Sequence, residues 1–173
     1  ESVLPATAYS YRLKALNPAG ESLWSPITTA VTWSQLQEWL LLNFGDPNAL
    51  NPAALVARAS DGTLPLLRYA FNLSATEPAR TLIPGQSTSG FPAIWLDPVR
   101  RRLNAEFVRR RASTNPGLIY RVQFSADLSA WDSPGAEVSV TPIDTLWERV
   151  RYQDTVDSSQ ATARFGRVTV SPP

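Results

Sequence analysis

The 173-residue chain contains no cysteine, no histidine and no methionine. Without histidine and cysteine it can form no Ser-His-Asp triad, no thiol nucleophile and no zinc or copper site built on soft ligands. Paired carboxylates can still cleave glycosides, but the 15 acidic residues are scattered and show no recognisable pair. We therefore predict a protein that is not an enzyme and that holds neither a cofactor nor a metal ion.

Long apolar runs and lysine are scarce as well. The apolar run Trp39–Leu42 is far too short to cross a bilayer, so we expect no membrane-spanning segment. All but one of the 16 basic residues are arginine, and 15 prolines stiffen the connections, a composition that fits either a durable extracellular protein or a GC-rich genome. Because the sequence does not begin with methionine, we expect a processed product or a piece of a longer protein.

Residues 1–32 carry two strand patterns. Residues 9–17 alternate large apolar and polar side chains, which is the period of a half-buried strand. Turn residues occupy 17–20, and residues 23–32 form a second segment rich in threonine, valine and isoleucine. If these strands stood alone they would expose a set of apolar side chains, which we take as candidates for a subunit contact: Tyr9, Tyr11, Leu13, Leu16, Trp24 and Ile27.

Residues 33–78 are predicted to form a small helical cluster. Thr32 and Gln35 have capping-box spacing, and Gly45 ends a helix whose apolar face holds Leu36, Trp39, Leu40 and Phe44. A short second helix is expected over residues 51–58, because Asn51-Pro52 suits a helix start. A third begins at Asp61 as its N-cap, with an apolar surface formed by Leu66, Leu67, Tyr69, Ala70 and Leu73.

Residues 91–173 are expected to form an antiparallel β-sandwich. Polar turns separate six short strand-like segments, 91–96, 101–109, 118–125, 137–141, 146–152 and 163–170. In the second segment, Leu103, Ala105 and Phe107 are predicted to face one side while Arg102, Asn104 and Glu106 face the other. Asn115–Gly117 reads as a hairpin turn, and residues 127–133 read as a polar loop.

Two resemblances follow from these motifs. Residues 1–32 resemble the late strands of a fibronectin type III domain, at Tyr9, Tyr11, Leu13, Ala15, Asn17, Gly20 and Ser22. A complete sandwich of that kind needs about seven strands, so the resemblance implies an incomplete fibronectin type III-like strand set that something else must complete. The predicted fold is mainly β, with an antiparallel β-sandwich and a small helical cluster.

Residues 33–170 are similar to the C-terminal region of large secreted surface proteins from some environmental Gram-negative bacteria. Three groups of residues carry this resemblance: Asp61, Gly62, Leu66, Leu67, Tyr69 and Ala70; Tyr120, Val122, Ser125, Asp127, Leu128 and Trp131; and Phe165, Arg167, Val168 and Val170. The related proteins carry an aspartate-rich loop that implies calcium. Here residues 57–62 hold a single carboxylate, so calcium is not expected and Asp61 is interpreted as a helix cap.

Charges and tryptophans offer further candidate contacts. Residues 100–111 hold six arginines and one glutamate, whereas residues 127–157 hold seven acidic residues and two arginines. We interpret the arginines as solvated strand ends, or as a patch that docks on the acidic segment of another subunit through Arg101 and Arg110. Nucleic acid is not expected, because no aromatic side chains alternate with the arginines; an acidic polysaccharide remains an alternative ligand.

The six tryptophans raise the question of a platform for sugar rings. Trp39 is expected in the helical core and Trp131 inside the sandwich, while Trp24, Trp33, Trp95 and Trp147 are left without an assignment.

The pattern as a whole favours an extracellular or cell-surface structural protein of a bacterium, a processed fibre subunit that assembles head to tail by strand complementation. The alternative is a carbohydrate-binding or anchoring C-terminal module of a larger secreted enzyme, whose missing strands lie upstream in the same polypeptide.

Overall fold

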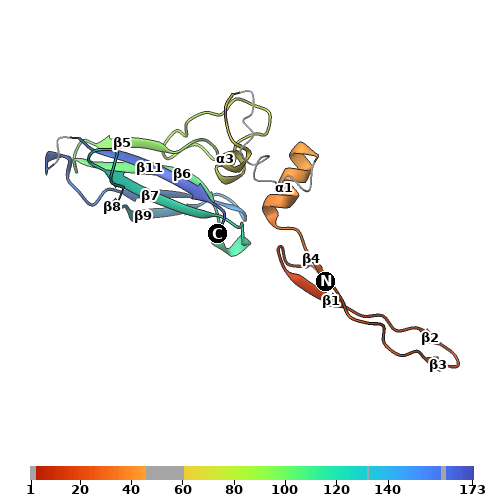
Figure 1. The fold of residues 1–173 in the computed structure, drawn as a ribbon. Coiled ribbons are helices and arrows are strands. Elements are labelled where there is room, and N and C mark those ends of the chain that lie inside the picture. Colours follow the sequence, from red (N-terminus) through yellow and green to blue (C-terminus); the bar gives the residue numbers. More distant parts are fainter. Residues whose placement is uncertain (1–2, 46–60, 132, 161–162) are drawn as a thin grey trace.

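The structure is a computed structural model that describes residues 3–45, 61–131, 133–160 and 163–173. A β-sandwich forms the body, the two α-helices of the described residues lie at one end of it, and a two-stranded arm extends away from the helices (Figure 1). No helix within the described residues is long and apolar enough to cross a membrane. The helix expected over residues 51–58 falls outside the described residues.

Two antiparallel sheets build the sandwich. The larger sheet has the strand order β5 (Ala93–Asp97), β6 (Arg102–Arg110), β10 (Trp147–Gln153) and β9 (Ala136–Pro142). The smaller sheet has the order β11 (Phe165–Ser171), β7 (Ile119–Ser125) and β8 (Ser133–Pro134). The prediction of a mainly β, antiparallel sandwich is confirmed, and the six expected strands lie within a few residues of their predicted bounds.

The core lies between the two sheets. Phe107 of β6, Phe124 of β7 and Val150 of β10 are fully buried, because the alternation along each strand directs them to the same interior. Tyr152 stacks on Phe107 with ring centres 6.0 Å apart. Phe71 enters the same cluster from the end of the helical region, and thereby joins the helices to the sandwich.

The outer face of β6 is also largely buried. Leu82, in the loop before β5, packs on Val108 and Trp147 over this face. Asn104 and Glu106 lie on the face opposite Ala105 and Phe107, as the alternation predicts, and both are buried there. Glu106 accepts the Gly85 N–H of the covering loop, and Asn104 bonds to Arg102 O and to Gln153, so both polar side chains have partners in place of water.

The segment between β6 and β7 is not a hairpin. The two strands belong to different sheets, so residues 111–118 cross from one sheet to the other. A short 3-10 turn, Ala112–Thr114, begins the crossing, and Asn115 takes a left-handed conformation with φ 48°. The turn chemistry at Asn115–Gly117 was thus correctly placed, but the hairpin prediction is wrong.

The first helix, α1 (Gln35–Phe44), ends at Gly45 as predicted, with Gly45 in the left-handed region at φ 72°. Its capping box differs from the expectation: Ser34 caps the helix and exchanges hydrogen bonds with Gln37, so the Thr32–Gln35 pair does not form the box. Leu36 and Leu40 of α1 pack on Tyr69 of the second described helix, α3 (Pro65–Ala70).

The arm consists of four short strands that, within the part of the chain that the structure describes, pair only with one another. β1 (Ala8–Tyr11) pairs with β4 (Thr28–Val31), and β2 (Leu16–Asn17) pairs with β3 (Gly20–Glu21). The turn falls at 17–20, as the sequence predicts, and Asn17 Oδ1 accepts the Ala19 N–H there. We call residues 7–32 the hairpin arm (Figure 1).

Candidate functional site

Most of the apolar candidates on the hairpin arm are exposed. Tyr11, Leu13, Leu16, Trp24 and Ile27 lie largely in solvent, with 77% of Leu13 exposed. Tyr9 differs, because it is half-buried and its hydroxyl accepts the Leu4 N–H at 2.7 Å. Leu23, which the sequence did not single out, is the most exposed of the set at 93%. A two-stranded ribbon with this much exposed apolar surface is marginally stable on its own in water.

Polar contacts within the arm hold its shape but leave its outer edges open. Between the two paired regions, the N–H groups of Ser22 and Ser25 donate to Ala15 O and Leu13 O, and the hydroxyls of the same serines accept the N–H groups of Ala15 and Leu13. The guanidinium of Arg12 lies 4.3 Å from the ring centre of Trp24. Because a cation covers this ring, Trp24 is a poor platform for a sugar.

The two arginine candidates have different surroundings. Arg101 is exposed in the turn between β5 and β6, with φ 52°. Arg110, in contrast, is only 9% exposed, and its guanidinium lies between the rings of Tyr69 and Trp147. The interpretation of residues 109–111 as a solvated strand end therefore does not hold for Arg110.

Charges that the sequence places in separate patches meet inside one sheet. Arg109 of β6 contacts Glu148 of β10 at 2.7 Å and Glu137 of β9 at 2.9 Å. These partners are neighbours because β6, β10 and β9 lie side by side in the larger sheet. Asp154 of the same acidic segment pairs with Arg164. The segment thus uses three of its carboxylates in ion pairs within the chain, which weakens the case for docking between subunits through the arginine cluster.

The remaining tryptophans are largely taken up by the fold. Trp39 packs beside Tyr69 in the helical cluster as expected, and Trp147 and Trp95 belong to the cluster on the outer face of the larger sheet. Trp131 is half-buried but belongs to none of the described core clusters; its ring lies 4.1 Å from the guanidinium of Arg167. It does not fill the sandwich interior as predicted.

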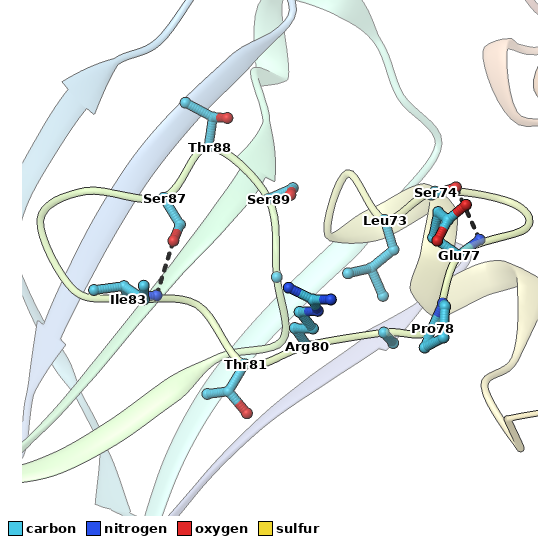
Figure 2. A pocket seen from close by; sticks show the side chains of 12 residues that line it. Leu73, Ser74, Glu77, Pro78, Arg80, Thr81, Ile83, Ser87, Thr88 and Ser89 are labelled. Atoms are coloured by element: carbon cyan, nitrogen blue, oxygen red, sulfur yellow. Dashed lines mark hydrogen bonds between the residues drawn. The ribbon is translucent and has the colours of Figure 1, made fainter.

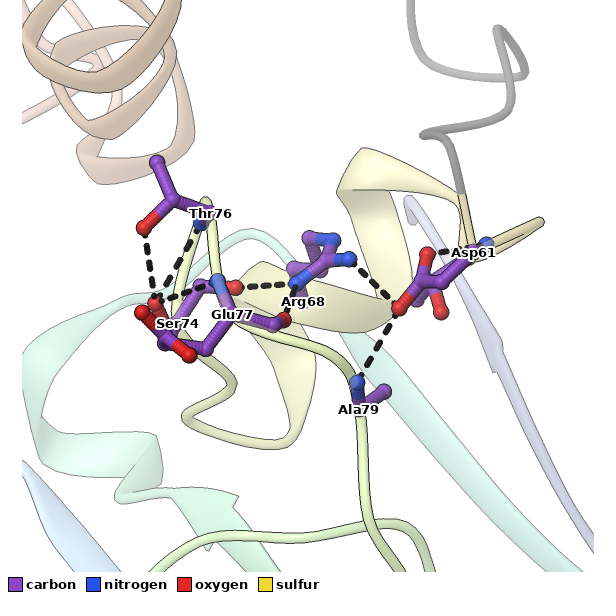
Figure 3. Close-up of polar contacts among 7 residues, drawn as sticks. Asp61, Arg68, Ser74, Thr76, Glu77 and Ala79 are labelled. Atoms are coloured by element: carbon purple, nitrogen blue, oxygen red, sulfur yellow. Dashed lines mark hydrogen bonds and ion pairs between the residues drawn. The ribbon is translucent and has the colours of Figure 1, made fainter.

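Asp61 is not a helix cap. Its carboxylate accepts the N–H groups of Thr63 and Ala79, and it forms an ion pair with Arg68 at 2.8 Å (Figure 3). Hydrogen bonds from these backbone groups, that of Ala79 first, hold the pKa of Asp61 well below its usual range. Helix α3 begins at Pro65 instead, without a side-chain cap.

Arg68 is the centre of this network. It is 2% exposed, and its guanidinium donates to the carbonyl oxygens of Ser74 and Glu77 as well as to Asp61 (Figure 3). The guanidinium of Arg68 therefore supplies a positive charge to the oxygen acceptors around Asp61, the residue at which the resemblance implied calcium. Within the described residues, no group of three potential metal-binding side chains is found.

Residues 73–90 form a loop between α3 and β5 that encloses a cavity of about 520 Å³ (Figure 2). The neck of the loop is closed by two backbone bonds, Leu82 N–H to Phe91 O and Phe91 N–H to Arg80 O. Gly90 permits this close approach, because a Cβ there would lie 2.7 Å from the Leu82 nitrogen and its φ is 137°. Sequence reasoning missed this loop; its only signal was the long stretch of small and polar residues before the first strand.

No protein-family model matches the chain, and no curated protein sequence matches it. Both resemblances therefore remain expectations, and the functional proposals below rest on the described contacts.

Proposed function

We propose that the protein is a non-catalytic structural module that assembles with copies of itself by adding the hairpin arm to a β-sheet of the next copy. The observation that carries the proposal is that, among the described residues, the arm pairs only with itself while it exposes apolar side chains along its length. Strand addition satisfies the open backbone edges and buries such side chains at once. An extracellular or cell-surface location suits this function and belongs to the proposal.

The acceptor we propose is the free edge of β11. In the described part of the chain this strand pairs with β7 alone. Its seven residues contain no proline, and Arg167 is the only charge among them. The other long edge strands are less open: Pro92 and Pro98 flank β5, Pro134 precedes β9 by two residues, and Pro142 is its last residue.

A second copy is the partner because donor and acceptor lie on the same chain at different places. A contact between the arm of one copy and β11 of the next is heterologous, so repetition gives an open filament rather than a closed dimer. The resemblance to late fibronectin type III strands supports a different partner, namely strands upstream in a longer polypeptide. In that case the isolated chain stays monomeric.

Because the chain has no cysteine, pairs of single-cysteine variants can test the contact without background disulfides. We expect Ser10→Cys and Thr169→Cys variants, when mixed under mild oxidation, to form a mixed disulfide dimer. The matched control pairs Ser10→Cys with Ser139→Cys, on the edge strand β9. Equal cross-linking in both mixtures, or a monomeric intact chain in analytical ultracentrifugation, contradicts the proposal.

A further inference from the structure

We infer that the cavity enclosed by residues 73–90 binds a uronic acid residue, whose carboxylate pairs with Arg80 and whose hydroxyls bind Glu77 and the surrounding serine and threonine side chains. The inference is independent of the proposed assembly, because the cavity and the hairpin arm share no residues. A volume of about 520 Å³ falls in the range of roughly 300–1,000 Å³ that is typical of small-molecule sites.

Arg80 supplies the positive charge. Figure 2 shows its side chain directed into the space between the two halves of the loop. Within the part of the chain that the structure describes, its guanidinium has no hydrogen-bond or ion-pair partner. A planar guanidinium matches a carboxylate through two parallel N–H bonds, so a carboxylated ligand would use the group that the fold leaves open.

Apart from Arg80, Glu77 is the one charged residue of the lining, and several of the uncharged lining residues are serines and threonines. Thr81, Thr88 and Ser89 belong to the lining of the cavity and are exposed, and within the described residues none of their hydroxyls has a partner. Glu77 lies beside Ser74, away from Arg80 (Figure 2). Its backbone is bound by Ser74 and Arg68, but its carboxylate has no partner among the described residues.

This combination selects the class of ligand. A fully ionised inorganic anion has no hydrogen-bond donor for the Glu77 carboxylate. A neutral sugar has no charge to pair with Arg80, so it would not gain a charge-assisted hydrogen bond there. A uronic acid carries one carboxylate and several hydroxyls on one ring, so it meets both requirements.

The cavity is held in shape before any ligand binds. Side chains from outside the loop bind its backbone at separate points: Asp61 to Ala79 N–H, Glu106 to Gly85 N–H, Arg149 to Ser87 O and Asn72 to Thr88 O. Arg68 adds a bond to Glu77 O on the same loop. A loop fixed in this way loses little further conformational freedom on binding, which favours affinity.

The test is isothermal titration calorimetry of the intact chain with oligogalacturonate, with the same oligosaccharide after reduction of its carboxyl groups, and with sodium acetate. We expect binding of the acidic oligosaccharide only, and a loss of roughly tenfold or more for Arg80→Gln, the size expected for a hydrogen bond to a charged group. Glu77→Gln should weaken binding of the acidic oligosaccharide as well, because Glu77 accepts sugar hydroxyls.

The matched control is Arg121→Gln, which removes an exposed arginine on β7 outside the cavity and should bind like the parent chain. If Arg80→Gln and Arg121→Gln lose affinity equally, the binding is general charge attraction and the inference is wrong. Equal binding of the carboxyl-reduced oligosaccharide, equal binding of acetate, or no binding of the acid form also overturns it.

Discussion

The guanidinium carbon of Arg110 lies 3.9 Å from the centre of the Tyr69 ring, and this contact joins helix α3 to strand β6. Trp147, the neighbour of Arg110 on β10, lies 4.5 Å away from the same guanidinium. Within the described residues Arg110 has no carboxylate partner; its bonds run to Tyr69 O and Gln35 Oε1. Burial lowers the pKa of Arg110, so the two rings and the oxygens must stabilise a charge that water does not reach.

Replacing Arg110 with lysine tests this contact. Lysine keeps the charge but loses the planar group that stacks on both rings, so we expect a loss of about 2 kcal/mol in the free energy of unfolding. Urea denaturation measures it. The exposed variant Arg121→Lys should stay within about 0.5 kcal/mol of the parent chain. Similar losses at both positions would mean that the rings contribute nothing specific.

The fold was largely predictable from sequence and the cavity was not, for physical reasons. Strands such as β7 and β11 follow from local alternation, which depends only on neighbouring residues. Glu106 and Arg110 are buried by contacts with residues more than 20 positions away, Gly85 and Tyr69, and no local pattern encodes such contacts. In sequence, a polar residue that binds a distant backbone group cannot be told from one that binds water. The loop of residues 73–90, which covers Glu106, was therefore not predicted.

Arg68 makes calcium unnecessary for the loop after residue 60. We expect a chelator to leave the melting temperature unchanged, because the guanidinium already occupies the oxygen acceptors of Asp61, Ser74 and Glu77. Arg68→Met, which leaves those acceptors without a donor, should destabilise by about 3 kcal/mol or more. Arg80→Met, at an exposed arginine in the neighbouring loop, is the control and should change stability little. A fall of several degrees on chelation would reveal a metal site.

Acid should weaken the fold through carboxylates whose pKa is lowered. Hydrogen bonds, first from the Ala130 N–H, hold the pKa of Asp127 well below its ordinary 3.8. The folded state therefore binds fewer protons than the unfolded one, so this contribution is complete above about pH 4 and is lost as pH falls toward the lowered value. Asp127→Asn should flatten the dependence of unfolding free energy on pH below 4. The difference should persist in 0.5 M salt, because hydrogen bonds cause it; its disappearance would indicate long-range charge effects instead.

The absence of histidine and cysteine leads us to expect no catalysis. A screen for glycosidase, esterase and protease activity should show no turnover above buffer. The prediction is wrong if turnover is measured and a single Asp→Asn or Glu→Gln substitution abolishes it. Such a result would show a catalytic carboxylate that neither the sequence pattern nor the packing of the fold identifies.

Assembly through the hairpin arm should depend on side chains that contribute nothing to the isolated fold. Leu13 and Leu23 are mostly exposed, so replacing both with serine should leave the unfolding free energy of the sandwich unchanged. In a strand-added filament each would be buried, at about 1.5–3 kcal/mol per side chain, so the double variant should shift sedimentation toward monomer. Val99→Ser, at an exposed apolar residue in the turn after β5, is the control and should assemble like the parent chain.

If the double variant and the control sediment alike, or if removal of residues 1–32 leaves assembly intact, the arm is not the donor. The upstream strands of a longer polypeptide then become the better partner for it.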